Sequence, residues 1–66
     1  MLIYVNSRPQ EVATGVTLQG LLEVLNMSDK RVAVEVNHEL VIKREWSVHE
    51  LKADDRVEIV SFVGGG

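Results

Sequence analysis

The chain has 66 residues, a net charge of −3 and no cysteine. This length limits it to one small domain, and the missing cysteine excludes disulfide and thiolate chemistry. The charge offers no basic face for nucleic acid and weakly favours partners with basic surfaces. No apolar run approaches the ~18 residues of a membrane span, and residues 1–6 lack the basic region of a signal peptide. We therefore expect a cytoplasmic protein that binds neither nucleic acid nor membranes.

The first two elements are predicted to form a β-hairpin. LIYV at residues 2–5 is rich in β-branched and aromatic residues, which is typical of a strand. Turn residues follow at 6–9. Because Pro9 cannot donate a ladder hydrogen bond, the second strand is expected at an edge of the sheet, over residues 10–13.

A helix is predicted after this hairpin. Thr17 is a typical helix N-cap, and Asn26 is a reasonable stop. Leucines between them recur at i, i+3, i+4 and i+7, the spacing of one helical face. We interpret this stripe as core rather than as a groove for a partner. The leucines are Leu18, Leu21, Leu22 and Leu25.

A second hairpin is predicted in the middle of the chain. Valines alternate with other residues over 32–36, which indicates a half-buried strand. Residues 37–38 form a tight turn, and 40–42 form a short return strand. The stretch 43–52 is irregular, with one helical turn and with Leu51 in the core.

The last predicted strand runs over residues 56–63, and its register matters for function. Its alternating residues form two faces. One face carries Val57 and Ile59; the other carries Glu58, Val60 and Phe62. We expect the second face to be exposed because a charge is rarely buried unpaired. The alternative is the opposite register, with Val60 and Phe62 in the core.

Together these elements predict an α+β roll, a mixed sheet of four to five strands packed on one main helix. The first and last strands would pair in parallel at the middle of the sheet. A single helix leaves one sheet face open to solvent. The expected division is a domain over residues 1–63 and a flexible glycine tail over 64–66.

The sequence contains no recognisable catalytic or metal site. His38 and His49 each begin an HEL triplet, but neither has a second histidine four residues along, as zinc proteases require. Serines lack nearby histidine–acid partners, and no helix follows the final glycines to make a phosphate loop. We therefore expect no catalytic residue, metal or bound cofactor, and a small enzyme is a remote alternative.

Several stretches resemble the ubiquitin-like sulfur carriers, and most of all the ThiS family of thiamine biosynthesis. They are IYVN, Thr17 followed by LQGLLEVL, VAVEVN followed by LVIKREW, and the ending ADDRVEIVSFVGGG. The resemblance covers the whole chain and implies a β-grasp (ubiquitin-like) roll. Two departures lie in turns: the family often has Gly where His38 stands, and Gly-Asp where Asp54-Asp55 stands. Neither touches the final glycines.

The resemblance also implies a chemistry for Gly66. A ThiF-type adenylyltransferase, related to ubiquitin-activating enzymes, would use ATP and magnesium to adenylate its carboxylate. Sulfur from a donor protein would displace AMP, leaving a thiocarboxylate. A ThiG-type thiazole synthase would then receive the sulfur.

Other residues near the end of the chain have expected roles in this scheme. Gly64 and Gly65 lack Cβ atoms and would thread into a narrow enzyme site. Large exposed apolar groups often mark protein interfaces. The expected docking residues are Val60, Phe62, Val63, Leu2 and Tyr4.

Four alternatives remain at this point. The small subunit of molybdopterin synthase shares the fold and the tail chemistry. Related carriers serve tRNA thiolation or amino-acid sulfuration. A ubiquitin-like interaction module without C-terminal chemistry is a different class, and an unordered glycine end is the ordinary interpretation of such a tail.

Overall fold

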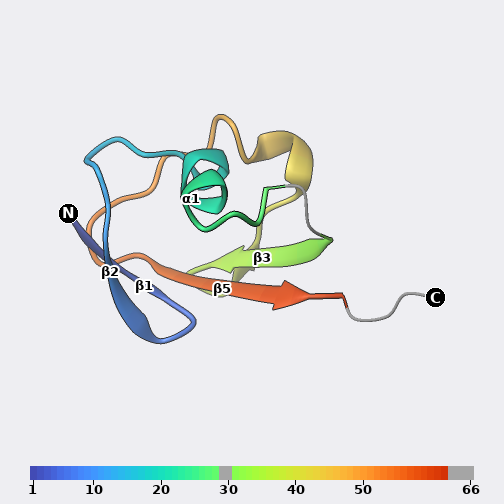
Figure 1. Ribbon diagram of the computed structural model, residues 1–66, viewed down its shortest axis with the longest axis horizontal. Coiled ribbons are helices and arrows are strands. Elements are labelled where there is room, and N and C mark those ends of the chain that lie inside the picture. The colour runs from blue at the N-terminus through green and yellow to red at the C-terminus, as the bar shows by residue number, and fades with distance from the viewer. Residues whose placement is uncertain (29–30, 63–66) are drawn as a thin grey trace.

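Over its described residues, the chain folds into a five-stranded mixed sheet with one α-helix lying across one of its faces (Figure 1). The computed structural model describes residues 1–28 and 31–62. The strand order is β2-β1-β5-β3-β4. The elements are β1 (Leu2–Val5), β2 (Arg8–Glu11), α1 (Leu18–Val24), β3 (Val32–Val36), β4 (Glu39–Leu40), a 3₁₀ turn (Lys43–Glu45) and β5 (Arg56–Ser61). This is the predicted α+β roll.

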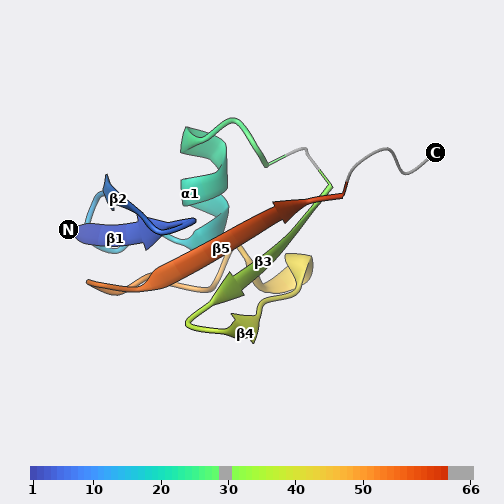
Figure 2. The ribbon, with the colours of Figure 1, turned by 90° about the horizontal axis from the view of Figure 1, so that it is seen from below.

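The last strand, β5, lies at the centre of the sheet, as predicted. It runs parallel to β1, with Val5 opposite Val57, and antiparallel to β3, with Val34 opposite Ile59. Figure 2 looks onto the sheet from the side opposite α1 and shows β5 crossing the molecule between β1 and β3. The segment that precedes the glycines is therefore held between two neighbouring strands.

Both hairpins turn through two residues of positive φ. Asn6 and Ser7 have φ of 51° and 70°, and Asn37 and His38 have 52° and 70°. Type I′ turns need positive φ at both central residues and match the twist of the flanking strands. His38 therefore occupies a backbone conformation that glycine adopts without strain.

Strand β2 begins two residues earlier than predicted. The sequence placed its start after Pro9, whereas Pro9 lies within β2, opposite Tyr4. In a hairpin with a two-residue turn, this second pair from the turn is not hydrogen-bonded, so the proline nitrogen faces away from β1. Because β2 is an edge strand, as predicted, no ladder bond is lost there.

The seven-residue helix α1 is capped at its N-terminus by side chain and backbone together. Thr17, the predicted N-cap, accepts a hydrogen bond from the amide of Gly20 at 3.1 Å. The amides of Leu18 and Gln19 donate to carbonyls in the segment 46–49, at 2.8 and 2.9 Å. The first-turn donors, which a helix leaves unpaired, are thus satisfied partly by the Thr17 side chain and partly by a distant segment.

The C-terminal end of α1 has the geometry of a Schellman motif. Asn26 has φ of 59°, and its amide donates to the carbonyl of Glu23 at 3.0 Å. The amide of Met27 reaches back to the carbonyl of Leu22 at 2.7 Å. Asn26 is therefore the stop that the sequence predicted.

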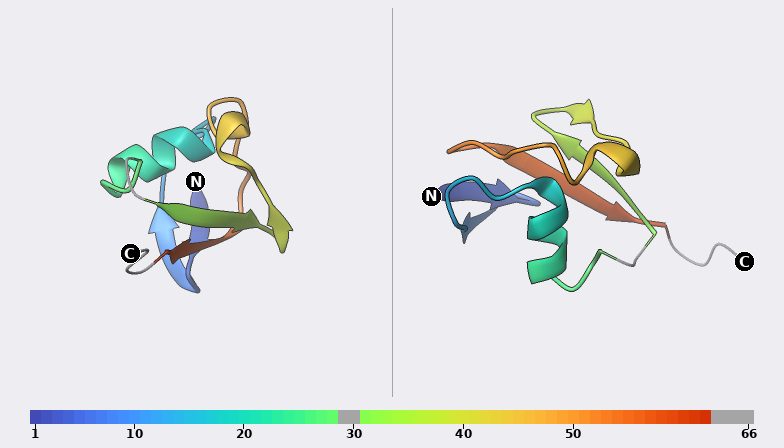
Figure 3. Two further views of the ribbon diagram at one scale, coloured as in Figure 1. Left: turned by 90° about the vertical axis from the view of Figure 1, so that its right-hand side faces the viewer. Right: turned by 90° about the horizontal axis from the view of Figure 1, so that it is seen from above.

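One apolar core lies between the sheet and α1, with the 3₁₀ turn on the same side of the sheet (Figures 1 and 3). Trp46 is a member that the sequence did not assign: its ring is buried, and its Nε1 donates to the carbonyl of Val41 at 2.9 Å. Each large apolar side chain contributes roughly 1.5–3 kcal/mol by burial. The core comprises Ile3, Leu18, Leu21, Leu22, Val32, Val34, Val36, Val41, Trp46, Leu51, Val57 and Ile59.

Candidate docking surface

The described part of the chain ends in a well-paired strand. Beyond β5, the amide of Phe62 donates to the carbonyl of Arg31 at 2.9 Å. Pairing with the β3 side therefore continues to the last described residue. Val63 and Gly64–Gly66, to which the sequence assigned docking, threading and modification, lie outside the described residues.

The two faces of β5 are as predicted. Val57 and Ile59 lie under α1 and are buried. Val60 and Phe62 are 58% and 59% exposed on the opposite face. The alternative register is therefore wrong, and two large apolar side chains lie on the open face at the end of β5 nearest the glycines.

Leu2 and Tyr4 share this open face but lie beside the other end of β5. Tyr4 is opposite Arg56, four residues before Val60, which corresponds to about 13 Å along a strand. The guanidinium carbon of Arg56 lies 4.9 Å from the centroid of the Tyr4 ring, a cation–π geometry. Tyr4 is half-buried, and Leu2 is 37% exposed.

Residues of β3 and β4 that the sequence did not single out complete the surface around Val60. Register places Ala33 opposite Val60 and Glu35 opposite Glu58. Leu40 of β4 lies opposite Glu35 and is 64% exposed. The alternation over residues 32–36 places Glu35 on the face of its strand opposite the valines. Only the strand order shows that this face brings Glu35 beside Glu58.

Asn6 holds β5 in place beyond the last residue of β1. Its Oδ1 accepts from the amide of Ile59 at 2.8 Å, and its Nδ2 donates to the carbonyl of Ile59 at 3.3 Å. The amide side chain thus substitutes for one more residue of a neighbouring strand. This pairing fixes the stretch of β5 that presents Val60.

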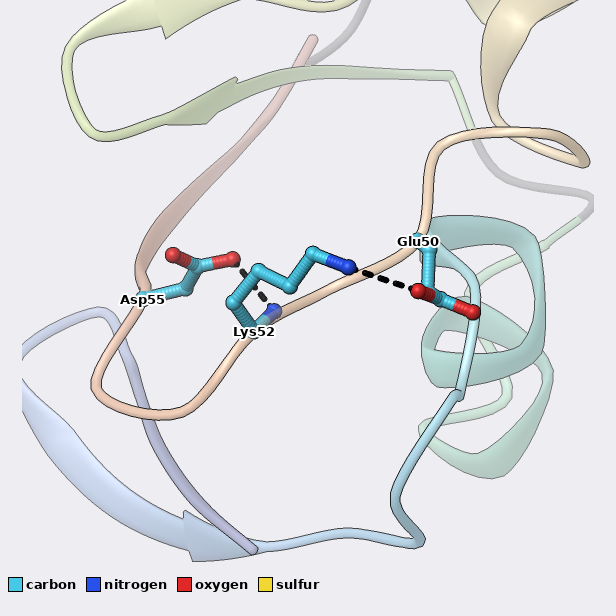
Figure 4. Close-up of polar contacts among 3 residues, drawn as sticks. All are labelled: Glu50, Lys52 and Asp55. Carbon is cyan, nitrogen blue, oxygen red and sulfur yellow. Dashed lines mark hydrogen bonds and ion pairs between the residues drawn. The ribbon is translucent and has the colours of Figure 1, made fainter.

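The turn before β5 is organised by a small polar cluster. Asp55 Oδ2 accepts from the amide of Lys52 at 2.8 Å, and Asp55 Oδ1 accepts from Asn37 Nδ2 at 3.0 Å. The Lys52 ammonium contacts Glu50 Oε1 at 2.7 Å (Figure 4). This hydrogen bond and the charge attraction lower the pKa of Glu50 and raise the pKa of Lys52. The cluster is solvent-exposed, and its contacts shape the turn that begins β5.

Buried polar side chains and clusters of metal-binding side chains are both absent within residues 1–28 and 31–62. No polar or charged side chain is buried there. No three metal-binding side chains gather into a cluster in these ranges. The described helices include none that is long and apolar enough to cross a membrane.

The chain is similar to known proteins both in sequence and in fold. The ThiS family model matches residues 3–66 of the chain. The chain belongs to the ThiS family. A crystal structure of the thiamine biosynthesis protein ThiS from Geobacter metallireducens superposes with a TM-score of 0.86, at 32% identity over the whole of both chains. This likeness confirms the β-grasp roll.

Curated relatives of this ThiS-family chain include carriers and longer proteins. The sulfur carrier protein ThiS of Escherichia coli is 27% identical over 66 residues and is covered completely. That of Bacillus subtilis is 44% identical over 50 residues, 76% of each chain. A thiazole synthase of Magnetococcus marinus is 39% identical over 66 residues. The whole chain matches there but spans only 20% of that protein's length.

Proposed function

We propose that the protein is a sulfur carrier of thiamine biosynthesis, with Gly66 as the residue that carries sulfur. The observation that carries the proposal is the ThiS family match, which extends through the glycines to residue 66. It is supported by Val60 on the open face of β5 and by Phe62 just beyond this strand, which are both more than half exposed and lie a few residues before those glycines.

The proposed chemistry takes place on the C-terminal carboxylate. An α-carboxyl group has a pKa near 3.3–3.7, so it is ionised at neutral pH. It attacks the α-phosphate of ATP, bound with magnesium by the activating partner, and pyrophosphate leaves. The resulting acyl adenylate is an activated electrophile. Sulfur supplied by the donor protein at the oxidation level of sulfide then attacks the acyl carbon, the bond between that carbon and the phosphate oxygen breaks, AMP leaves, and the product is a thiocarboxylate.

Glycine suits this position for steric reasons. Three extended residues reach roughly 10 Å beyond a strand, and Gly64–Gly66 carry no side chain that would obstruct a narrow site. The ordering entropy of glycine is lost when the tail binds. This cost weakens each complex, which suits a carrier that must leave one partner for another. The protein is thus a co-substrate, and catalysis belongs to its partners.

Thiazole synthase is the proposed sulfur acceptor. The whole chain matches a fifth of two thiazole synthases, from Magnetococcus marinus and Paramagnetospirillum magneticum, at 39% and 33% identity. A domain that forms part of the same chain as an enzyme in some organisms is a good candidate for a partner of that enzyme.

A growth experiment separates this pathway from the molybdenum pathway, whose carrier has the same tail chemistry. A strain that lacks the protein should require thiamine or its thiazole precursor, and its molybdenum enzymes should stay active. Growth without thiazole, together with loss of molybdenum-enzyme activity, would assign the carrier to molybdopterin synthesis instead.

A further inference from the structure

Two glutamates face each other at the centre of the open sheet face. Glu58 of β5 lies directly opposite Glu35 of β3, in the region where Figure 2 shows these strands side by side. Within residues 1–28 and 31–62, neither carboxylate forms an ion pair within 4.0 Å. The nearest cation along β5 is Arg56, which is placed over the ring of Tyr4.

The stability of the folded domain does not explain why these two glutamates lie opposite each other. Like charges directly opposite each other on neighbouring strands are destabilising. Other opposed positions on this face avoid the conflict: Ala33 lies opposite Val60, and Tyr4 lies opposite Arg56. A destabilising arrangement on an otherwise consistent sheet is expected at functional sites.

Exposed apolar side chains border the two carboxylates. Leu40 lies beside Glu35 on β4, and Val60 follows Glu58 on the same face of β5. Both are more than half exposed. The surface therefore combines two adjacent acceptors with apolar groups on either side.

This combination fits one kind of side chain. A guanidinium group is planar and offers five donors in a fixed fork, so it can bond two neighbouring carboxylates at once. Its alkyl stem packs on apolar surface while the charged head is paired. An ammonium group is a point charge and fits such a pair less well.

We propose that Glu35 and Glu58 together bind an arginine on the surface of thiazole synthase, and so determine how the carrier docks. The proposal rests on the proposed function, because it takes that enzyme as the partner. Leu40 and Val60 flank the arginine stem, and Phe62 contacts the enzyme closer to the glycines.

The first test measures the affinity of the full-length protein for its own thiazole synthase. Glu35→Gln and Glu58→Gln should each weaken binding by about tenfold or more, because tenfold corresponds to the weakest couplings measured for close charge pairs at interfaces. Each variant should also melt at or above the temperature of the unmodified protein, because the repulsion is relieved. Glu23→Gln, on the exposed side of α1, is the matched control and should bind normally.

A second measurement identifies the residue on the enzyme. Phenylglyoxal modifies arginines, and the wild-type carrier should protect one arginine of thiazole synthase from it. The double variant Glu35→Gln/Glu58→Gln should not protect that arginine.

The outcomes separate this proposal from the proposed function. Normal binding by both glutamate variants, with weakened binding by Phe62→Asp, would overturn the arginine site and leave the carrier function intact. Weakened binding without arginine protection would also overturn it. If the wild-type protein does not bind thiazole synthase at all, both the arginine site and the proposed acceptor are wrong.

Discussion

The side-chain amide of Asn6 pairs with the backbone of Ile59, 53 residues further along the chain, through both its oxygen and its nitrogen. This contact joins the first hairpin turn to the central strand. It extends the parallel pairing of β1 and β5 past the point where β1 ends. The stretch of β5 that leads to Val60 and Phe62 is thereby held on the β1 side as well as the β3 side.

We predict that Asn6→Gly lowers the free energy of unfolding by about 1–3 kcal/mol, because a partly buried amide and carbonyl lose their partner. Glycine keeps the positive φ of this position, so the loss reports on the side-chain bonds. Urea unfolding provides the measurement. Ser7→Gly in the same turn is the control and should not destabilise; equal behaviour of the two variants would contradict the role assigned to Asn6.

Local patterns in the sequence predicted most of the fold. The leucine spacing gave α1, and the alternation around Glu58 gave the correct register of Val60 and Phe62. Local patterns failed where the bounds of a strand depended on its pairing with a neighbouring strand. The sequence placed the start of β2 after Pro9, because only the pairing with Tyr4 shows that its nitrogen faces away from the ladder.

The candidate docking surface was only partly predictable for the same reason. Val60 and Phe62 follow from alternation within one strand. The proximity of Glu35 and Leu40 depends on strand order and register between segments far apart in sequence. Leu2 and Tyr4 were expected to dock partners together with Val60 and Phe62, but the parallel register places Tyr4 opposite Arg56, beside the start of β5.

Glycine should stabilise the domain when it replaces His38, a turn residue of positive φ. His38→Gly should raise the free energy of unfolding by up to about 1 kcal/mol, because a side chain at φ of 70° is strained. The gain is reduced by the greater freedom of glycine in the unfolded chain. Thermal melting should show this change. Arg8→Gly, on β2, is the control and should destabilise; a loss of stability in His38→Gly would refute the strain argument.

Partner binding and folding should respond to different apolar residues. Phe62→Asp should weaken binding to the activating enzyme with a change in stability within about 0.5 kcal/mol, as for most surface substitutions. Leu22→Ala removes a buried side chain and should cost about 2–5 kcal/mol. Calorimetric melting measures the stability of each variant, and a binding titration measures its affinity for the activating enzyme. A large drop in melting temperature for Phe62→Asp would show that Phe62 supports the core.

The ion pair between Glu50 and Lys52 should contribute to stability in a pH-dependent way. The pKa of Glu50 is lowered in the folded protein from its ordinary value of 4.5. The contribution of the ion pair to stability is therefore present at pH values above this ordinary pKa and is lost as the pH falls through the lowered pKa of Glu50. Melting curves of the unmodified protein and of Glu50→Gln should differ at neutral pH and converge in acid. A difference that persists at the lowest pH would contradict this assignment.

The most direct test of the carrier function is the intact mass of the protein after incubation with its activating enzyme, ATP, magnesium and a sulfur source. The account predicts that one oxygen is replaced by sulfur, with fragment masses placing the change on Gly66. A variant that lacks Gly65 and Gly66 should stay folded, because every core side chain that the structure describes lies at or before Ile59, and should not be modified. An unchanged mass, under conditions in which the same enzyme modifies another carrier, would contradict the central claim.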